Sequence, residues 1–281
     1  MTIEQLQEIA AQVRRDIIRM VYGAKSGHPG GSLGCTDVVT ALYFDVMDID
    51  PQNFTKEGRG EDMFFLSNGH ISPMLYSVMA RRGYFPVNEL GTFRKLNTRL
   101  QGHPTPVEGL PGLRIASGSL GQGLSVSIGA AIAKKSNGDP HTVYTLTGDG
   151  ELEEGQVWEA FMFAGAKQVD NLIAIIDHNK KQIDGPTDEV MNLGSLKQKL
   201  EAFNWIVLEM DGNNMRQVVD TLVLAKTKLG NGRPVAIVMK TEMGMGVDFM
   251  MGTHKWHGTP PNQEQAEKAL AQLPETSLGD Y

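Results

Sequence analysis

Cysteine is almost absent from this sequence: Cys35 is the only one among 281 residues. A single thiol excludes an intrachain disulfide and a metal cage built from cysteines. We therefore expect Cys35 to be a small buried apolar residue, which is the ordinary environment of a free cysteine.

Long apolar runs and clusters of basic residues are also missing. No stretch approaches the roughly 18 apolar residues needed to span a bilayer, so we expect no membrane partner. The N-terminus is mixed in charge and lacks the pattern of an export signal, so we expect a cytoplasmic protein. The net charge is −7 and no Lys/Arg-rich stripe is present. Nucleic acid is therefore not an expected partner, because neutralising phosphates requires clustered basic groups.

Glycine, by contrast, is abundant. The chain has 32 glycines, where average usage would give about 20. They gather in short clusters, which indicates tight turns and close approach of the backbone to a bound molecule. The remaining composition, 41% apolar and 21% charged, is ordinary for a globular protein.

Helices and buried strands alternate along the chain. Apolar residues spaced three and four apart predict helices at 3–25, 36–47, 72–82, 118–135, 153–167, 193–203 and 215–229. Short apolar runs predict strands at 62–67, 142–147, 172–177, 205–210 and 235–239. Residues 86–117 have the composition of a long irregular loop. The alternation is typical of an α/β fold in which a parallel β-sheet is flanked by helices on both faces. We expect one domain over residues 1–281, in which residues 262–281 form a short closing helix and a C-terminal tail.

The strongest chemical signal lies at the ends of two predicted strands. One strand ends at Gly148-Asp149-Gly150, and the next ends at Asp177-His178-Asn179. Parallel strands bring both ends to one edge of the sheet, where open α/β sheets bind ligands. A carboxylate and an amide oxygen there suit Mg²⁺, and Gly150 allows a diphosphate to approach the backbone. Gly-Asp-Gly alone is more often an ordinary turn, but its pairing with Asn179 is much more specific.

Four histidines stand next to glycines in predicted loops: His28, His70, His103 and His257. Any one of them alone is more often a surface or turn residue. Four in such loops indicate a site, because loops at a sheet edge carry binding and catalytic residues. Imidazoles suit proton transfer with sugar hydroxyls near neutral pH and can donate hydrogen bonds to a diphosphate.

These patterns resemble a known family. The span from Gly148 to Asn179 resembles the thiamine-diphosphate signature, which opens with GDG and closes with Asn. The contexts SGHPG, SNGH, GHP and HGTP around the four histidines resemble those of transketolase, and the similarity runs from about Asp16 to Pro261. The resemblance implies the thiamine-diphosphate-binding fold of the diphosphate-binding (PP) type, with thiamine diphosphate and Mg²⁺ as cofactors and Ca²⁺ or Mn²⁺ able to substitute.

The resemblance also implies roles for individual residues. The metal ligands would be Asp149, Asn179 and the backbone carbonyl of Lys181, although a lysine is a departure from the family at that position. The catalytic residues would be His28, His70, His103 and His257. The cofactor-binding residues would be His70, Gly118, Leu120, Gly150, Glu154, Asn179, Ile183 and His257, with Glu154 close to a subunit interface.

The activity implied is that of a transferase in carbohydrate metabolism, for example in the pentose phosphate pathway. It would move a two-carbon ketol group from a ketose phosphate to an aldose phosphate. In transketolases the glutamate that activates the cofactor lies in a second, pyrimidine-binding domain. We therefore expect this chain to be the N-terminal subunit of a split transketolase that forms an α2β2 heterotetramer with a C-terminal subunit. The helices at 118–135 and 158–166 are candidate interface surfaces.

Three alternatives stay open at this point. The chain resembles in outline the α subunit of a 2-oxo-acid dehydrogenase, but the four histidine contexts argue against that interpretation. A non-catalytic relative is disfavoured because Asp149, Asn179 and all four histidines are retained. A fragment of a longer transketolase would have the same sequence features.

Overall fold

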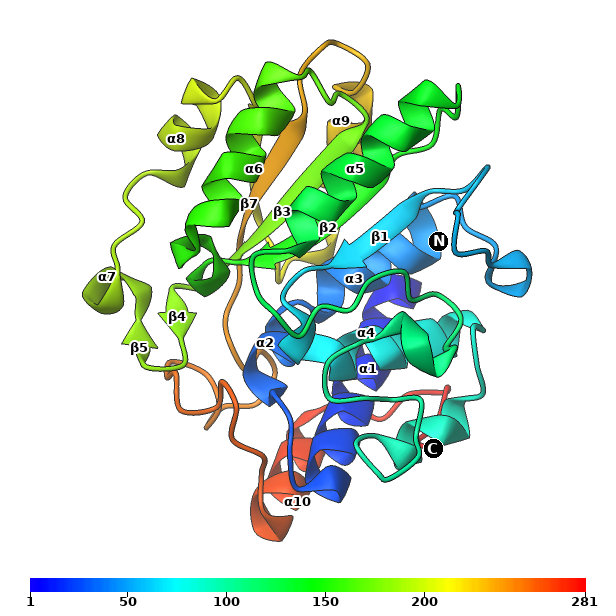
Figure 1. The fold of residues 1–281 in the computed structure, drawn as a ribbon. Coiled ribbons are helices and arrows are strands. Elements are labelled where there is room, and N and C mark those ends of the chain that lie inside the picture. Colours follow the sequence, from blue (N-terminus) through cyan, green and yellow to red (C-terminus); the bar gives the residue numbers. More distant parts are fainter.

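A five-stranded parallel β-sheet runs through the centre of the computed structural model, which describes residues 1–281 (Figure 1). The strands lie in the order β1-β2-β3-β7-β6. Their bounds are Met63–Leu66 (β1), Val143–Gly148 (β2), Leu172–His178 (β3), Ile206–Asp211 (β6) and Val235–Lys240 (β7). In the register of β2 and β3, Gly148 lies opposite Asp177, so these two strands end at the same level.

Helices cover both faces of this sheet. One face packs against α1 (Ile3–Ala24), α3 (Thr36–Ala41), α4 (Ser72–Arg82) and α9 (Met215–Thr227), and the other against α5 (Gly123–Ser136), α6 (Gly155–Ala166) and α8 (Leu196–Ala202). Along β3, Ile173 and Ile175 enter the first core, whereas Ala174 and Ile176 enter the second. This alternation of buried side chains is the pattern of a strand covered on both sides. The predicted α/β fold with a doubly covered parallel sheet is confirmed.

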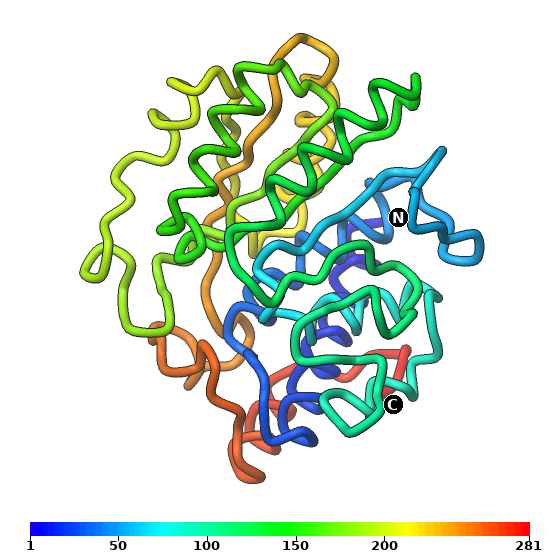
Figure 2. Tube along the Cα trace, in the orientation of Figure 1, coloured from blue at the N-terminus to red at the C-terminus, as the bar shows by residue number.

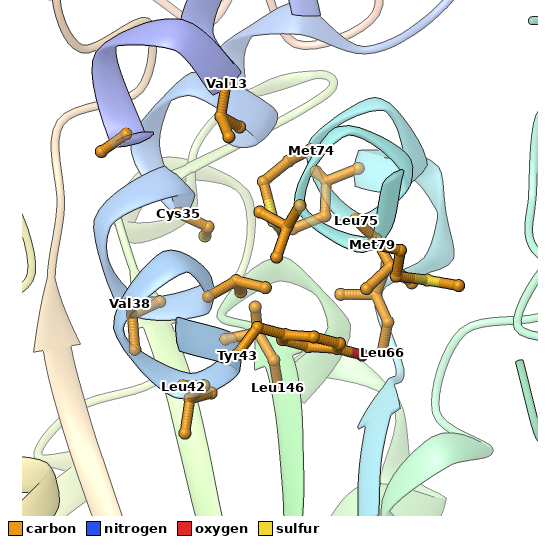
Figure 3. Close-up of a cluster of buried hydrophobic side chains, with 14 of the residues drawn as sticks. Val13, Cys35, Val38, Leu42, Tyr43, Leu66, Met74, Leu75, Met79 and Leu146 are labelled. Carbon is orange, nitrogen blue, oxygen red and sulfur yellow. The ribbon is translucent and has the colours of Figure 1, made fainter. Parts of the chain in front are cut away.

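The core on the α1 side joins segments that are distant in the sequence. Figure 3 shows Val13 of α1, Tyr43, Met74 of α4 and Leu146 of β2 around Cys35. Cys35 is fully buried, as expected, and burial raises the pKa of its thiol well above the usual value. The thiol is therefore an inert packing group.

The first helix follows the sequence pattern closely. Thr2 and Gln5 form a capping box that starts α1, and Ile9, Val13, Ile17 and Met20 are all buried on its inner face. The helix ends at Ala24, and its C-cap residue Lys25 has a φ of 50°, in the left-handed region. The chain then turns into the glycine-rich segment that carries His28.

Several boundaries differ from the prediction. The helix expected at 36–47 is shorter, because α3 gives way to a π-helical turn at Leu42–Val46, and a separate helix α2 (Pro29–Gly34) precedes it. Helix α5 starts at Gly123 instead of 118, because Gly121 adopts a φ of 81° that no helix contains. A small hairpin of β4 (Lys181–Gln182) and β5 (Gly185–Pro186), followed by α7 (Thr187–Val190), was not predicted. Its strands are too short to leave a pattern in the sequence.

Residues 86–117 are irregular, as predicted, and contain only two short 3₁₀ turns (Figure 2). The last helix, α10 (Gln263–Gln272), packs against α1 through Ala266 and Ala269. Arg15 then binds Asp280 with two hydrogen bonds of 2.8–2.9 Å. Residues 262–281 therefore lie against the first helix. None of the helices is both long and apolar enough to cross a membrane.

Candidate active site

A cavity of about 350 Å³ opens at the carboxyl edge of the sheet. Its walls come from residues that directly follow β1, β2, β3 and β7, together with the loops that carry His28, His103 and His257. This edge is where parallel α/β sheets bind ligands. The predicted site residues that line it are His28, His70, His103, Gly118, Leu120, Asp149, Gly150, Asn179, Lys181, Ile183 and His257.

The four predicted imidazoles form one cluster. The ring of His28 lies with its centroid 5.0 Å from that of His70, 5.6 Å from His257 and 6.2 Å from His103. The centroids of His70 and His257 are also 5.0 Å apart. Four loops that are far apart in the chain therefore deliver their histidines to one wall of the cavity.

Glycines make this convergence possible. Gly30 donates its backbone N–H to the carbonyl of Trp256 at 3.0 Å and accepts from Gly244 at 2.9 Å, which ties the loop before His257 to the His28 segment. A Cβ on Gly30 would lie 2.8 Å from the Trp256 oxygen, so no larger residue fits. The SGHPGG segment thus needs glycine for close backbone packing.

The pKa of each of the four imidazoles is lowered, so the rings stay neutral at pH 7 and below, although His103 is exposed and the other three are partly buried. Desolvation, with smaller contributions from the neighbouring His257, Arg94 and His103, lowers the pKa of His28 to about 4. Desolvation is also the largest cause of the lowered pKa of His70, His103 and His257. Each ring therefore offers one donor and one acceptor nitrogen, which allows it to bind hydroxyls and to hold or release a proton.

An acidic corner lies beside this cluster. Asp149 is 1% exposed and accepts backbone hydrogen bonds from Gly150 at 2.9 Å and Lys180 at 2.6 Å. The amide of Asn179 donates to Asp177 at 2.8 Å, which fixes the orientation of the Asn179 side chain. Asp177 is itself held by the hydroxyl of Thr241. Strand ends of β2 and β3 thus place an acid and an amide in the same cavity.

Two buried carboxylates lie together in the acidic corner. Desolvation and the nearby Asp177 raise the pKa of Asp149 to about 8, because two carboxylates are buried together. A divalent cation would supply the missing positive charge. The chain has no group of three or more His, Cys, Asp or Glu residues placed to hold a metal ion. A metal here would therefore need amide, carbonyl and ligand oxygens, which is the donor set that Mg²⁺ prefers.

The cavity also has room and partners for a polar ligand. His28 Nδ1, His257 Nδ1 and Asn68 Oδ1 are buried polar atoms without a hydrogen-bond partner, and all three residues line the cavity. A Cβ on Gly150 would lie 2.9 Å from that of Gln182, so glycine keeps the backbone close to this wall. Unpaired buried polar atoms are costly, and a hydrogen-bonding ligand such as a diphosphate would satisfy them.

The lysine at position 181 does not introduce a free charge. Its Nζ donates to Glu242 Oε1 at 3.0 Å, and Glu242 also accepts from the backbone N–H of Gly252 at 2.8 Å. The ammonium group is therefore neutralised by a carboxylate, while the backbone of Lys181 donates to Asn179 Oδ1 at 2.9 Å.

Comparison with known proteins identifies the family. Residues 5–274 match the family model described as the thiamine diphosphate-binding domain of transketolase. This chain belongs to the transketolase family.

Relatives that are named as transketolase subunits align with this chain along almost their entire length. The chain is 39% identical over 275 residues to an apulose-4-phosphate transketolase subunit of Phocaeicola vulgatus, covering 98% of this chain and 96% of that relative. It is 40% identical over 268 residues to a 6-deoxy-6-sulfo-D-fructose transketolase subunit of a Clostridium species, covering 95% and 96%. The prediction of a transketolase N-terminal subunit, an enzyme chain that acts with a second chain, is confirmed. Neither relative is a 2-oxo-acid dehydrogenase.

Solved transketolases have the same fold. The structure from Campylobacter jejuni superimposes with a TM-score of 0.89 at 34% identity, covering 97% of this chain and 43% of that chain. The transketolase from Leishmania mexicana gives a TM-score of 0.88 at 30% identity, covering 98% and 42%. The chain therefore spans less than half the length of these long transketolases and corresponds to their thiamine-diphosphate-binding domain.

One predicted site residue of this transketolase chain lies outside the cavity. Glu154 is exposed, and its Cβ lies 3.2 Å from the position that a Cβ on Gly121 would take. It sits where α5 and α6 meet, beside the paired amides of Gln122 and Gln156, which hydrogen-bond to each other at 2.8 and 3.2 Å. The residue therefore belongs to an outer surface.

The cavity also contains residues that the sequence did not single out: Asn68, Glu151, Asp177, Gln182 and Met243. The sequence could have indicated Asp177, because it ends a buried strand beside Asn179. It gave no indication that Glu151 is buried, because a glutamate in a run of acidic residues normally lies on the surface.

Proposed function

We propose that this chain binds thiamine diphosphate and a divalent cation in the cavity and holds the sugar substrate of ketol transfer with its imidazoles. The observation that carries the proposal is the convergence of four histidine loops on the same cavity as Asp149 and Asn179. When bound, thiamine diphosphate supplies the electron sink that allows the carbon–carbon bond beside a ketose carbonyl to break.

The metal and the diphosphate would occupy the acidic corner. Asp149, the Asn179 amide oxygen and the Lys181 carbonyl are the ligands that we assign to Mg²⁺, for which Ca²⁺ or Mn²⁺ would substitute. The raised pKa of Asp149 supports this assignment, because a cation would relieve the burial of its charge. Gly150 and His257 would contact the diphosphate.

The ring of the cofactor would lie toward the other end of the cavity. Gly118 and Leu120 line that end from the loop before α5, and Ile183 approaches from the β4–β5 hairpin. Ile183 is 62% exposed and Leu120 36%, and the faces of a flat heteroaromatic ring would cover such surfaces. We assign all three to cofactor binding, together with His70.

The imidazoles would act on the sugar. Neutral rings of His28, His70, His103 and His257 can accept protons from sugar hydroxyls and donate hydrogen bonds to a carbonyl oxygen in which negative charge develops. The low pKa of these groups supports this role, because a ring that is already protonated could not serve as a base.

A partner chain would complete the site. The outer face of α5 and α6 is poor in charge and exposes Val126, Ile132, Met162 and Phe163, of which Met162 is 54% exposed. Exposed apolar patches of this kind mark protein interfaces. We assign this face, with Glu154 at its edge, to a pyrimidine-domain subunit in an α2β2 assembly.

The substrates would be sugar phosphates or similar polyols. The two closely matching relatives are named for apulose 4-phosphate and 6-deoxy-6-sulfofructose, so donors outside the pentose phosphate pathway belong in any screen. The proposal is tested by titrating thiamine diphosphate into the complex of this chain and its partner, with Mg²⁺ and with a chelator. Saturable binding only with metal is expected, and metal-independent binding would contradict the proposed site.

A further inference from the structure

Glu151 joins three segments of the cavity wall. It follows Asp149 by two residues in the turn after β2 and is 2% exposed. Its Oε1 accepts hydrogen bonds from the Ser67 hydroxyl and from the backbone N–H of Gly121 at 2.8 Å. Its Oε2 accepts from the backbone N–H of Gly148 at 3.1 Å. One carboxylate thus connects the ends of β1 and β2 with the loop before α5.

The loop before α5 depends on these contacts for its position. Ser67 Oγ accepts the N–H of Gly123 at 3.1 Å, so Glu151 and Ser67 together hold the end of the loop. The start of the loop packs so tightly that a Cβ on Gly69 would lie 2.2 Å from the carbonyl oxygen of Ser117. Residues 118–120 lie between these two attachments, and both Gly118 and Leu120 line the cavity.

The hydrogen-bond partners of Glu151 are all neutral donors. A buried carboxylate is unfavourable unless hydrogen bonds compensate the loss of hydration, and a carboxylate is among the few side chains that can accept from three donors at once. An apolar residue would fill the same space but would release Gly121 and Gly148 from each other.

We propose that Glu151 is a positioning residue that sets the distance between the two ends of the cofactor site. It ties the 118–121 loop, assigned to the ring of thiamine diphosphate, to Gly148 next to Asp149 and Gly150, assigned to its diphosphate. This inference rests on the proposed function, because it uses those two assignments.

The test separates the two ends of the ligand. In the complex of this chain with its partner, Glu151→Gln replaces one accepting oxygen by an N–H donor that faces another donor. We expect this variant to bind thiamine diphosphate about tenfold more weakly, the size expected for a lost charge-assisted hydrogen bond. Its affinity for Mg²⁺ with inorganic pyrophosphate, which occupies only the diphosphate end, should stay within about twofold of the parent value. Glu201→Gln, exposed on α8, is the matched control and should change neither.

A second variant keeps the inference testable if Glu151→Gln folds poorly. Ser67→Ala removes the hydroxyl that bridges Glu151 and Gly123, and we expect the same selective loss. In the double variant the two effects should not add, because both residues act through the same hydrogen-bond network.

Three results would contradict either this inference or the proposed function on which it rests. Unchanged affinity for thiamine diphosphate in both variants would overturn the positioning role. Equal losses for thiamine diphosphate and pyrophosphate would also overturn it, because Glu151 would then support only the diphosphate corner. If the parent complex binds pyrophosphate and Mg²⁺ but not thiamine diphosphate, the proposed function itself fails, which is a distinct outcome.

Discussion

At the scale of single residues, the cavity shifts the pKa values of its ionisable groups toward the neutral form. Burial penalises the charged form of His28 and lowers the pKa of its ring to about 4, and burial is also the largest cause of the raised pKa of Asp149, about 8. Groups with shifted pKa values are concentrated at ligand-binding sites, because a bound cation or polar substrate supplies the charge or hydrogen bonds that the buried groups lack.

We expect the histidine cluster to make the folded chain less stable in acid. The folded pKa of His28 is about 4, whereas the unfolded value is about 6.5, so the unfolded chain binds the proton first as the pH falls. The stability linked to this group is complete above pH 6.5 and is lost as the pH drops toward 4. We expect His28→Gln to reduce the fall in the free energy of unfolding between pH 7 and pH 5 by about 2 kcal/mol. Denaturant unfolding of the apo chain measures this, and parallel curves for variant and parent would contradict it.

Replacing the metal ligand should remove cofactor binding. Asp149→Ala deletes the carboxylate that we assign to the cation, and we expect Mg²⁺-dependent binding of thiamine diphosphate to fall by more than about a hundredfold. Calorimetric titration of the reconstituted complex measures it. Asp220→Ala, exposed on α9, serves as the control. Normal binding by a folded Asp149→Ala variant would refute the metal assignment.

His103 should affect turnover more than affinity. Its ring lines the cavity, with its centroid 6.2 Å from that of His28. We expect His103→Asn to lower kcat about a hundredfold, the usual contribution of a proton-transfer group, with the Kd for thiamine diphosphate within about threefold of the parent value. Steady-state kinetics and a binding titration on the same preparation separate the two, and an unchanged kcat would remove His103 from the site.

At the scale of elements, the sequence predicted the helices and strands whose positions follow from the spacing of buried apolar residues. All five strands of the main sheet lie where apolar runs placed them. Strands β1, β2, β3 and β7 are buried on both faces and are therefore almost continuously apolar, whereas the edge strand β6 is only partly buried. The shortened α3, the later start of α5 and the β4–β5 hairpin depend on local dihedral angles and tertiary contacts, as with Gly121. Most cavity residues were predicted from glycine-flanked motifs. Glu151 and Asn68 were not, because only the assembled strand ends bring Glu151 to its hydrogen-bond donors and Asn68 to the cavity.

The face formed by α5 and α6 should bind the partner. Phe163 on α6 is 45% exposed and Leu224 on α9, on the opposite side of the sheet, is 43% exposed. We expect Phe163→Glu to weaken assembly with the partner at least tenfold, because it would bury a charge in an apolar contact. Leu224→Glu is the matched control and should assemble normally. Analytical ultracentrifugation of each mixture distinguishes them, and equal assembly of both variants would place the interface elsewhere.

At the scale of the whole molecule, the fold places the cavity at the carboxyl edge of the sheet beside the apolar outer face of α5 and α6. Leu120 and Ile183 lie at the cavity and are exposed, and Glu154 lies at the edge of the α5–α6 face. The two features adjoin, so a partner seated on that face would also close the ring end of the cavity. In this arrangement, this chain would hold the metal and the diphosphate, and the partner would complete the site for the ring of the cofactor.

Ketol transfer by separated and mixed chains tests this division most directly. The assay would contain thiamine diphosphate, Mg²⁺ and an aldose phosphate, with donors that include xylulose 5-phosphate and the two sugars named for the relatives. We expect no turnover from either chain alone, turnover from the mixture, and its loss when the mixture contains Asp149→Ala. Turnover by this chain alone at the rate of the mixture would contradict the account, because every group needed for catalysis would then lie in this chain.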